Sequence, residues 1–519
     1  MSHEGQVHSL VPPQSATLSD PAVESPKCEQ DHPSGQGATR SGLQTAMPQV
    51  FVYALCVFID KAFSIVTVPL MATYVPPDEF GRYEVAISLV DFVGLVLSFR
   101  MADTLVRFSG STHDRKHQIE AASELLGTGL LLALIFGMAV QLAIPFLTRF
   151  LAIDFDELAL QCGVGAASLA GLMEMPLVWA RFHDRAVFYL KFVIARACLL
   201  AGATISMLVL GYGTAGVMTA NAAIMTMCGV VLLWRLGGEV GISASRRGLR
   251  RVLTYGVPLV GASIAQFALG NCSRWFLSGQ VDNASLAHLG LATRLALASF
   301  LIYAPFAMWW GPRRFAVLSM ASGRETSVEM WGVGYAILLI GAAVVSNFGP
   351  LFIDYLLPAS YQPAGALIPL AALVQIINNL CWLSNLGSAA RDSGYQILRF
   401  DAAGAAVSLV GYATVLPWFG IYGALLAMMA GQGLRLGLYL TIGNRSSGIV
   451  YPLGRAVLAL TVGTVLLLLA PHSASGIARL CWGTLSVIVL LMALMGMRLL
   501  NRPVGRAWAL IRVRAWQVR

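Results

Sequence analysis

Long apolar segments recur along this chain from Val50 to Leu500, and they restrict the possible folds more than any other feature. Many of them approach the roughly 20 residues that a helix needs to cross about 30 Å of hydrocarbon. Charged residues make up only 12% of the sequence, too few to cover a water-soluble surface. The apolar runs are continuous rather than alternating, so they predict helices and not barrel strands. We therefore expect a membrane all-α fold.

The runs predict about fourteen transmembrane helices joined by short loops. Their approximate ranges are 48–74, 84–106, 122–147, 158–180, 190–210, 214–234, 253–278, 286–310, 331–353, 364–389, 401–418, 421–442, 453–470 and 477–499. The residues before the first span are rich in Ser, Pro, Gly and Gln and cannot bury a core, so residues 1–45 are expected to form a disordered tail.

Basic residues near the span ends fall almost entirely in alternate loops, with the densest group at Arg246–Arg251. The opposite set of loops offers only Arg82, Arg149 and Arg479. Lys and Arg accumulate on the cytoplasmic side of membrane proteins. This distribution predicts an even number of spans with both termini in the cytoplasm, and it argues against nucleic acid as the partner of the basic residues.

An internal repeat divides the chain. Phe80–Tyr83 resembles Leu289–Ala292, and Gly213–Val217 resembles Gly420–Ala424, at a nearly constant offset. Each unit contains six spans, so both copies should face the same way, related by a pseudo-two-fold axis along the membrane normal. The predicted parts are the cytoplasmic tail 1–45, an N-terminal six-helix lobe 46–250, a C-terminal six-helix lobe 251–445, and a helix pair with a basic tail 446–519.

Short motifs in order along the chain carry a family resemblance. They are Pro69–Tyr83, Leu105–Phe108, Pro176–Arg181, Tyr255–Pro258, Arg274–Leu277, Trp310–Pro312 and Leu356–Ala364. Together they resemble the polysaccharide flippases, the Wzx-type branch of the multidrug/oligosaccharidyl-lipid/polysaccharide (MOP) exporter superfamily. The family often has Asp where this chain has Ser273, so this position is not expected to couple an ion here.

The resemblance implies translocation of a polyprenyl-diphosphate-linked oligosaccharide repeat unit from the cytoplasmic to the periplasmic leaflet by alternating access. The product would serve surface or exopolysaccharide (including lipopolysaccharide) biosynthesis in the bacterial inner membrane. The expected partners are the lipid-linked glycan, membrane lipids, and a polysaccharide polymerase with its export machinery. No enzymatic activity, cofactor or metal is expected.

Cations within the spans are the first candidates for the site, because a diphosphate needs matching charge in a medium of low dielectric constant. Those expected to line a cavity are Lys61, Arg100, Arg274 and Arg294, with pairing to internal acids as the alternative. Arg196 and Arg435 lie nearer the cytoplasmic ends of their spans, where snorkelling to the interface accounts for them.

Carboxylates within the spans could couple transport to an ion. The candidates are Asp60, Asp91 and Glu174, whereas Asp401 at the start of a span is expected to be interfacial. Asp91 could instead neutralise Lys61, since the first two spans run antiparallel.

Two other functions remain open from the residues. A cation-coupled exporter of small drugs or metabolites would have the same fold but a cavity of acids and aromatics. A membrane enzyme that polymerises or ligates glycans would need a sizeable outward loop, and every outward loop predicted here is short.

Overall fold

The protein is described by a computed structural model over residues 67, 69–109, 114–150, 154–183, 185–318, 320, 322–389, 394–444, 447–469 and 476–500. These residues all belong to one compact unit, Gln49–Arg519. They are almost entirely helical and contain no strand, which confirms the all-α prediction for this part of the chain. Most of the first predicted span, including Asp60 and Lys61, lies outside the described residues, which include only positions 67 and 69–74 of it.

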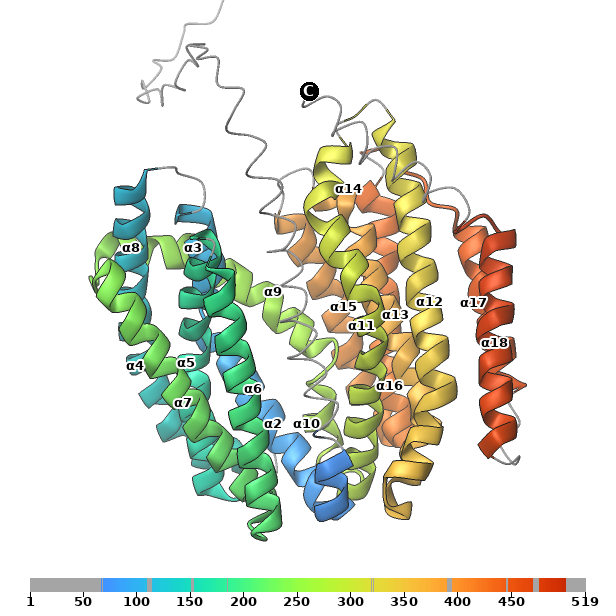
Figure 1. Cartoon of the computed structure of the whole chain (residues 1–519), viewed down its shortest axis with the longest axis horizontal. Coiled ribbons are helices and arrows are strands. Elements are labelled where there is room, and N and C mark those ends of the chain that lie inside the picture. Colours follow the sequence, from blue (N-terminus) through green and yellow to red (C-terminus); the bar gives the residue numbers. More distant parts are fainter. Residues whose placement is uncertain are drawn as a thin grey trace, which may run out of the picture. The chain divides into compact units, whose positions relative to one another are not determined.

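The first half of the unit forms one group of packed helices (Figure 1). Its members are α2 (Pro77–Leu97), α3 (Met101–Ser109), α4 (Arg115–Phe150), α5 (Glu157–Phe182), α6 (Ala186–Val209) and α7 (Gly213–Val240). The short helix α8 (Arg246–Arg251), the π-turn η1 (Val252–Gly256), α9 (Val257–Ala268) and α10 (Ser273–Leu277) lead on to the second half.

The second half contains the remaining helices, which pack mainly on one another. They are α11 (Asn283–Leu318), α12 (Gly323–Leu356), η2 (Ala359–Leu367), α13 (Ile368–Ser384), α14 (Leu386–Ala389), α15 (Gly394–Thr414), α16 (Leu416–Leu438), η3 (Tyr439–Gly443), α17 (Leu453–Leu468) and α18 (Gly476–Gly496). Among these, α17 and α18 pack on each other and on α12.

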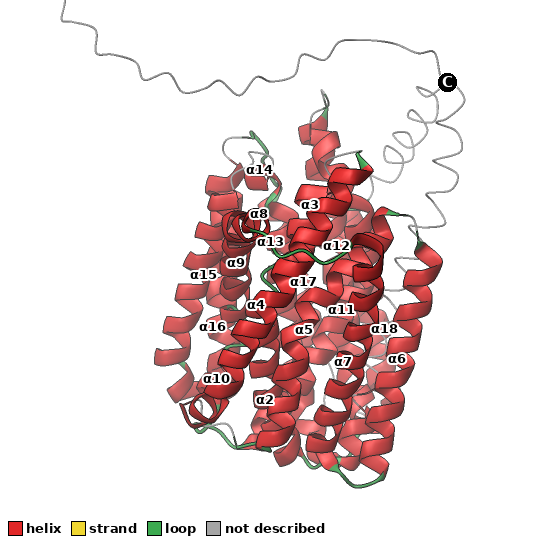
Figure 2. Cartoon of the chain, turned by 90° about the vertical axis from the view of Figure 1, so that its left-hand side faces the viewer, coloured by secondary structure: helices red, strands yellow, loops and turns green. Residues whose placement is uncertain are grey.

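Ten helices of the described part are long and apolar enough to cross a membrane. Every predicted span from 84–106 onward coincides with a helix or a broken helix, so this is a multi-pass membrane protein. The helices run up and down with short connections (Figure 2). We call the end with the loop at Asp282 the Asp282 end, and the opposite end, with α8, the Arg246 end.

Three predicted spans are broken rather than continuous. The span at 84–106 breaks between α2 and α3, where Phe99 and Arg100 have φ of 42° and 49°. Left-handed backbone costs about 1–2 kcal/mol at a residue with a side chain, so tertiary packing must hold it. Two glycines allow that packing, because a Cβ on Gly171 of α5 would lie 2.1 Å from Ser98 Cα, and one on Gly256 would lie 2.4 Å from the Phe99 carbonyl oxygen.

The span at 253–278 is divided into η1, α9 and α10 instead of one helix. Pro258 follows the π-turn, and because proline has no N–H it cannot complete the α-helical bond to residue 254. A second break falls at Leu269–Cys272, before the Arg274 helix. The span at 364–389 is likewise split into η2, α13 and α14.

Helices α2 and α11 join the two halves near the Asp282 end. A Cβ on Gly81 would lie 1.8 Å from the Asn283 carbonyl oxygen, and a Cβ on Gly290 would lie 2.6 Å from Glu84 Cδ. The amide of Asn283 also donates to the Asp78 carboxylate at 2.9 Å. Gly81 and Gly290 occupy equivalent positions of the sequence repeat, and each lets its helix approach the other.

Candidate anion-binding cavity

A cavity of about 610 Å³ lies among α2, α9, α10, α11, α13 and α16. Arg100, Arg274 and Arg294 line it, together with amide and hydroxyl side chains. Three of the four cations predicted to share a cavity are therefore brought together, from positions almost 200 residues apart in the sequence. The fourth, Lys61, lies outside the described residues.

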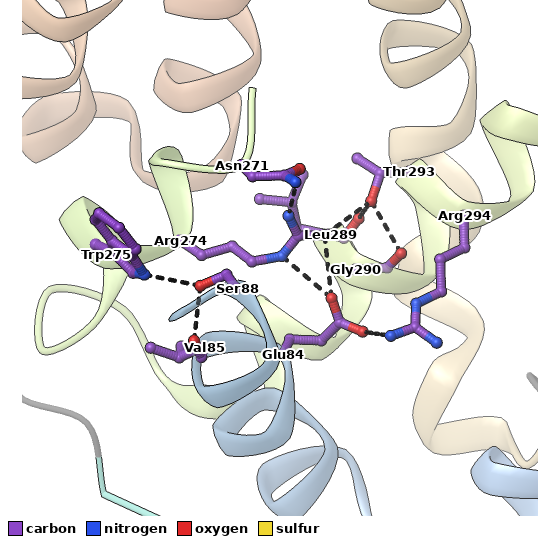
Figure 3. Close-up of polar contacts among 10 residues, drawn as sticks. All are labelled: Glu84, Val85, Ser88, Asn271, Arg274, Trp275, Leu289, Gly290, Thr293 and Arg294. Atoms are coloured by element: carbon purple, nitrogen blue, oxygen red, sulfur yellow. Dashed lines mark hydrogen bonds and ion pairs between the residues drawn. The ribbon is translucent and has the colours of Figure 1, made fainter. Parts of the chain in front are cut away.

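Glu84 of α2 is held by two of these arginines, which come from the other half (Figure 3). Arg274 donates a hydrogen bond from Nε to Glu84 Oε2 at 3.1 Å, and its Nη2 lies 3.0 Å from the same oxygen in an ion pair. Arg294 forms an ion pair with Oε1. The Glu84 side chain is 1% exposed, whereas those of Arg274 and Arg294 are 13% and 23% exposed. One buried carboxylate thus connects α2 with α10 and α11, and both guanidinium groups keep part of their surface accessible.

Pairing with internal acids was the expected alternative to cargo binding, but Glu84 was not among the predicted residues. The structure shows these pairs for both Arg274 and Arg294. Glu84 lies directly after the repeat motif Phe80–Tyr83, two turns into α2 but at the first residue of the predicted span 84–106. The rule that selected the cations, a charge within an apolar segment, passes over a residue placed at the end of a span.

Neighbouring groups fix the geometry of the cluster. Asn271 Oδ1 accepts a hydrogen bond from Arg274 Nη1 at 3.1 Å, and Trp275 Nε1 donates to Ser88 Oγ of α2 at 2.8 Å (Figure 3). The ring of Phe80 lies 5.4 Å from the Arg294 guanidinium, within cation–π range. Gly290 leaves the space that the Glu84 carboxyl fills.

Arg100 reaches the cavity from the strained break between α2 and α3. Its Nε lies 2.8 Å from Asp103 Oδ2, and the pair is about 40% exposed. An exposed pair of this kind contributes little to stability, so it leaves the guanidinium available. Arg100 also lines a second cavity of about 500 Å³.

This second cavity lies mainly among helices of the first half, and three carboxylates line it beside Arg100. Asp91 of α2, Asp103 of α3 and Glu174 of α5 line it. Two of the three carboxylates predicted for ion coupling therefore face one space, and the third, Asp60, lies outside the described residues. The pairing of Asp91 with Lys61 stays a prediction for the same reason.

Two predictions for the second half were wrong. Arg435 was expected to snorkel and Asp401 to be interfacial, yet their side chains are 6% and 4% exposed and form an ion pair with 2.6 Å between Arg435 Nε and Asp401 Oδ1. Tyr439 donates to Asp401 Oδ1 at 3.0 Å, and Gln266 donates from Nε2 to Oδ2 at 3.1 Å. Packing of α9 and α16 on α15 buries both charges, which the distance of a residue from a span end cannot reveal.

Comparison with known proteins agrees with this architecture. The family described as "Polysaccharide biosynthesis protein" matches residues 47–315. No curated protein sequence matches the chain.

Solved structures with the same fold are transporters by their descriptions. One, described as lipid II flippase MurJ in an inward closed conformation, is 13% identical with a TM-score of 0.64, over 85% of this chain and 98% of that one. A second, a multidrug resistance MATE family transporter of the MOP superfamily in an inward-facing conformation, is 15% identical with a TM-score of 0.56, over 75% and 94%. These similarities confirm the fold of about fourteen helices.

The family match covers more than half of the 519 residues and includes α2, Glu84, Arg274 and Arg294. The chain therefore belongs to the polysaccharide biosynthesis protein family, and its helices have the fold of the MOP superfamily.

Proposed function

We propose that this protein moves a polyprenyl-diphosphate-linked oligosaccharide repeat unit from the cytoplasmic to the periplasmic leaflet by alternating access. The observation that carries the proposal is the cavity between the halves, lined by Arg100, Arg274 and Arg294. The family's description and the MurJ-like fold support a lipid-linked glycan as the cargo. We further propose that it acts without enzymatic chemistry in the bacterial inner membrane, beside a polymerase and export machinery.

The arginines suit a diphosphate for a physical reason. A guanidinium presents several donors in a fixed plane, and charge-assisted bonds to phosphate oxygens are about twice as strong as neutral ones. Glu84 now occupies these donors with its two carboxylate oxygens. A cargo phosphate offers the same kind of acceptor with more charge, so it can replace Glu84 on Arg274 and Arg294.

Replacement of Glu84 would link cargo binding to movement of the halves. Glu84 belongs to α2, while its partners belong to α10 and α11, so the ion pairs hold the halves together near the Asp282 end. Once phosphate binds Arg274 and Arg294, the ion pairs with Glu84 are broken and no longer hold the two halves together at the Asp282 end. The Asp282 end, which we assign to the periplasmic side, can then open toward the outer leaflet.

The second cavity supports a role for Asp91 and Glu174 in ion coupling, with Asp60 as a further candidate. A cation that neutralises these carboxylates in one state and leaves in the other could supply the driving force. The same acids also suit an exporter of cationic drugs, which is the rival function. Arg274 and Arg294 line only one of the two cavities and Asp91 and Glu174 only the other, and this arrangement favours an anionic cargo with an accompanying cation.

The test is to replace Arg274 and Arg294 singly with Ala. Each change should abolish export of surface polysaccharide while the protein stays abundant, because both side chains face the cavity and Glu84 keeps one partner. Lys at either position should restore export poorly, since an ammonium lacks the planar fork. Protein level and surface polysaccharide are measured in the same strains.

Arg435→Ala serves as the control for a structural arginine. It leaves Asp401 buried without its ion-pair partner, which costs roughly 3–5 kcal/mol, so the protein itself should be lost. Normal polysaccharide with normal protein in both cavity variants contradicts the proposal. Export of cationic drugs by the wild type, with unchanged polysaccharide in its absence, would favour the rival function.

A further inference from the structure

The wall of the basic cavity in the second half carries five side-chain amides. They are Gln266, Asn271, Gln375, Asn378 and Gln432, from α9, the break after it, α13 and α16. Asn271 accepts a hydrogen bond from Arg274, whereas the other four form no described hydrogen bond with the arginines that face Glu84. Amides in a membrane-embedded cavity are costly to desolvate unless they have partners.

Arg435 determines the orientation of three of these side-chain amides. The two N–H groups on its Nη1 are shared among three amide oxygens, Gln266 Oε1 at 3.2 Å, Asn378 Oδ1 at 3.2 Å and Gln432 Oε1 at 3.0 Å. A guanidinium has donors and no acceptor, so only the oxygen end of an amide can face it. The NH₂ ends must therefore point elsewhere, and this orientation follows from chemistry.

One of these amide NH₂ groups donates a hydrogen bond within the protein, and the others are available to donate to a ligand. Gln266 donates from Nε2 to Asp401, whereas Asn378 and Gln432 have no acceptor for their NH₂ groups among the described residues. Asn271 repeats the pattern, because its oxygen accepts from Arg274 and its NH₂ group has no described acceptor. The ion pair of Arg435 with Asp401 holds the arrangement from behind the wall.

A wall of this kind offers hydrogen-bond donors to a ligand rich in acceptor oxygens. Sugars present ring, hydroxyl and acetamido oxygens. The cavity that the amides line is also lined by the arginines assigned to the diphosphate. Its volume of about 610 Å³ falls within the range of roughly 300–1,000 Å³ that is usual for ligand sites. Both parts of a sugar diphosphate would then contact one space.

We propose that Asn271, Asn378 and Gln432 form the subsite for the sugar joined to the diphosphate, with Arg435 as the residue that positions two of them. This inference rests on the proposed function and adds specificity to it. The arginines recognise the charge common to every polyprenyl diphosphate. The amides distinguish a carrier that bears a sugar from one that does not.

The experiment uses the purified full chain in vesicles and two probes. One is a polyprenyl diphosphate carrying a single N-acetylhexosamine, and the other is the same polyprenyl diphosphate without sugar. Asn378→Ala should weaken binding of the sugar-bearing probe about 3- to 10-fold, because each lost hydrogen bond is worth about 1 kcal/mol, and should leave the bare probe unchanged. Gln432→Ala, at an amide that forms no described hydrogen bond with Arg274 or Arg294, should have the same selective effect.

Asn347→Ala is the matched control, since Asn347 lines another cavity among α12, α13, α17 and α18. It should leave both probes unaffected. Equal losses for both probes, or no loss with Asn378→Ala and Gln432→Ala folded, overturn the sugar subsite while the proposed function stands. Failure of the wild type to bind either probe overturns the proposed function, and Arg274→Ala should abolish binding of both.

Discussion

At the scale of single residues, we predict that the ion pairs of Glu84 stabilise the closed contact between the halves. Glu84→Gln keeps the size of the side chain but offers one oxygen to two arginines, and its NH₂ group faces a second donor. The loss of one charge-assisted bond, worth about 1.5–3 kcal/mol, should increase opening at the Asp282 end about tenfold or more. A cysteine at Thr293, beside Arg274, should then react faster with an impermeant thiol reagent added from that side.

Asp154→Asn is the control for this change. Asp154 forms an ion pair with Arg82 at the same end of the molecule, but its side chain is 80% exposed. Exposed pairs contribute about 0–1 kcal/mol, so labelling at position 293 should hardly change. Equal labelling in wild type and Glu84→Gln would show that the Glu84 contact does not hold the halves together.

At the scale of elements, the break between α2 and α3 depends on close packing from α5. In Gly171→Ala the new Cβ would lie 2.1 Å from Ser98 Cα, which is backbone and cannot rotate away. The break should shift, with a cost of about 1–3 kcal/mol from overpacking, and Arg100 should lose its place between the two cavities. We expect a lower unfolding temperature in detergent together with reduced export.

Gly202→Ala on α6 is the matched substitution, because a Cβ there meets nothing within 4 Å. Alanine also favours helix by up to about 1 kcal/mol over glycine, so this variant should be as stable as the wild type or more so. If both variants unfold at the same temperature, the close packing of Gly171 on Ser98 does not stabilise the break between α2 and α3.

At the scale of the whole molecule, the alternating distribution of basic loops predicts which end faces the cytoplasm. In a background without native cysteines, Gln280→Cys at the Asp282 end should react with an impermeant thiol reagent in intact cells. Ala244→Cys at the Arg246 end should react only after permeabilisation. Both positions are exposed, so access to the reagent is matched. The reverse pattern would mean that the molecule has the opposite orientation and that the proposed direction of transport is wrong.

The class of fold could be predicted from the sequence because hydrocarbon imposes length and continuity on each span. From 84–106 onward the apolar runs coincide with helices, and Arg274 and Arg294 were found because a charge in such a run is rare. The repeat likewise selected Gly81 and Gly290, although their role in the contact of α2 with α11 was not evident. The length, apolar character and charge of a span are properties of one segment, so they can be predicted from the sequence of that segment alone.

The pairing of charges needed the tertiary structure. Glu84 with Arg274 and Arg294, and Asp401 with Arg435, join helices far apart in the sequence, and burial depends on which faces of those helices meet. The breaks at Phe99 and Arg100 arose for the same reason, since their backbone strain is held by Gly171 and Gly256 from other elements. Hydropathy records how apolar a segment is and not what lies beside it, so the spans were determined by sequence while the site was determined by packing.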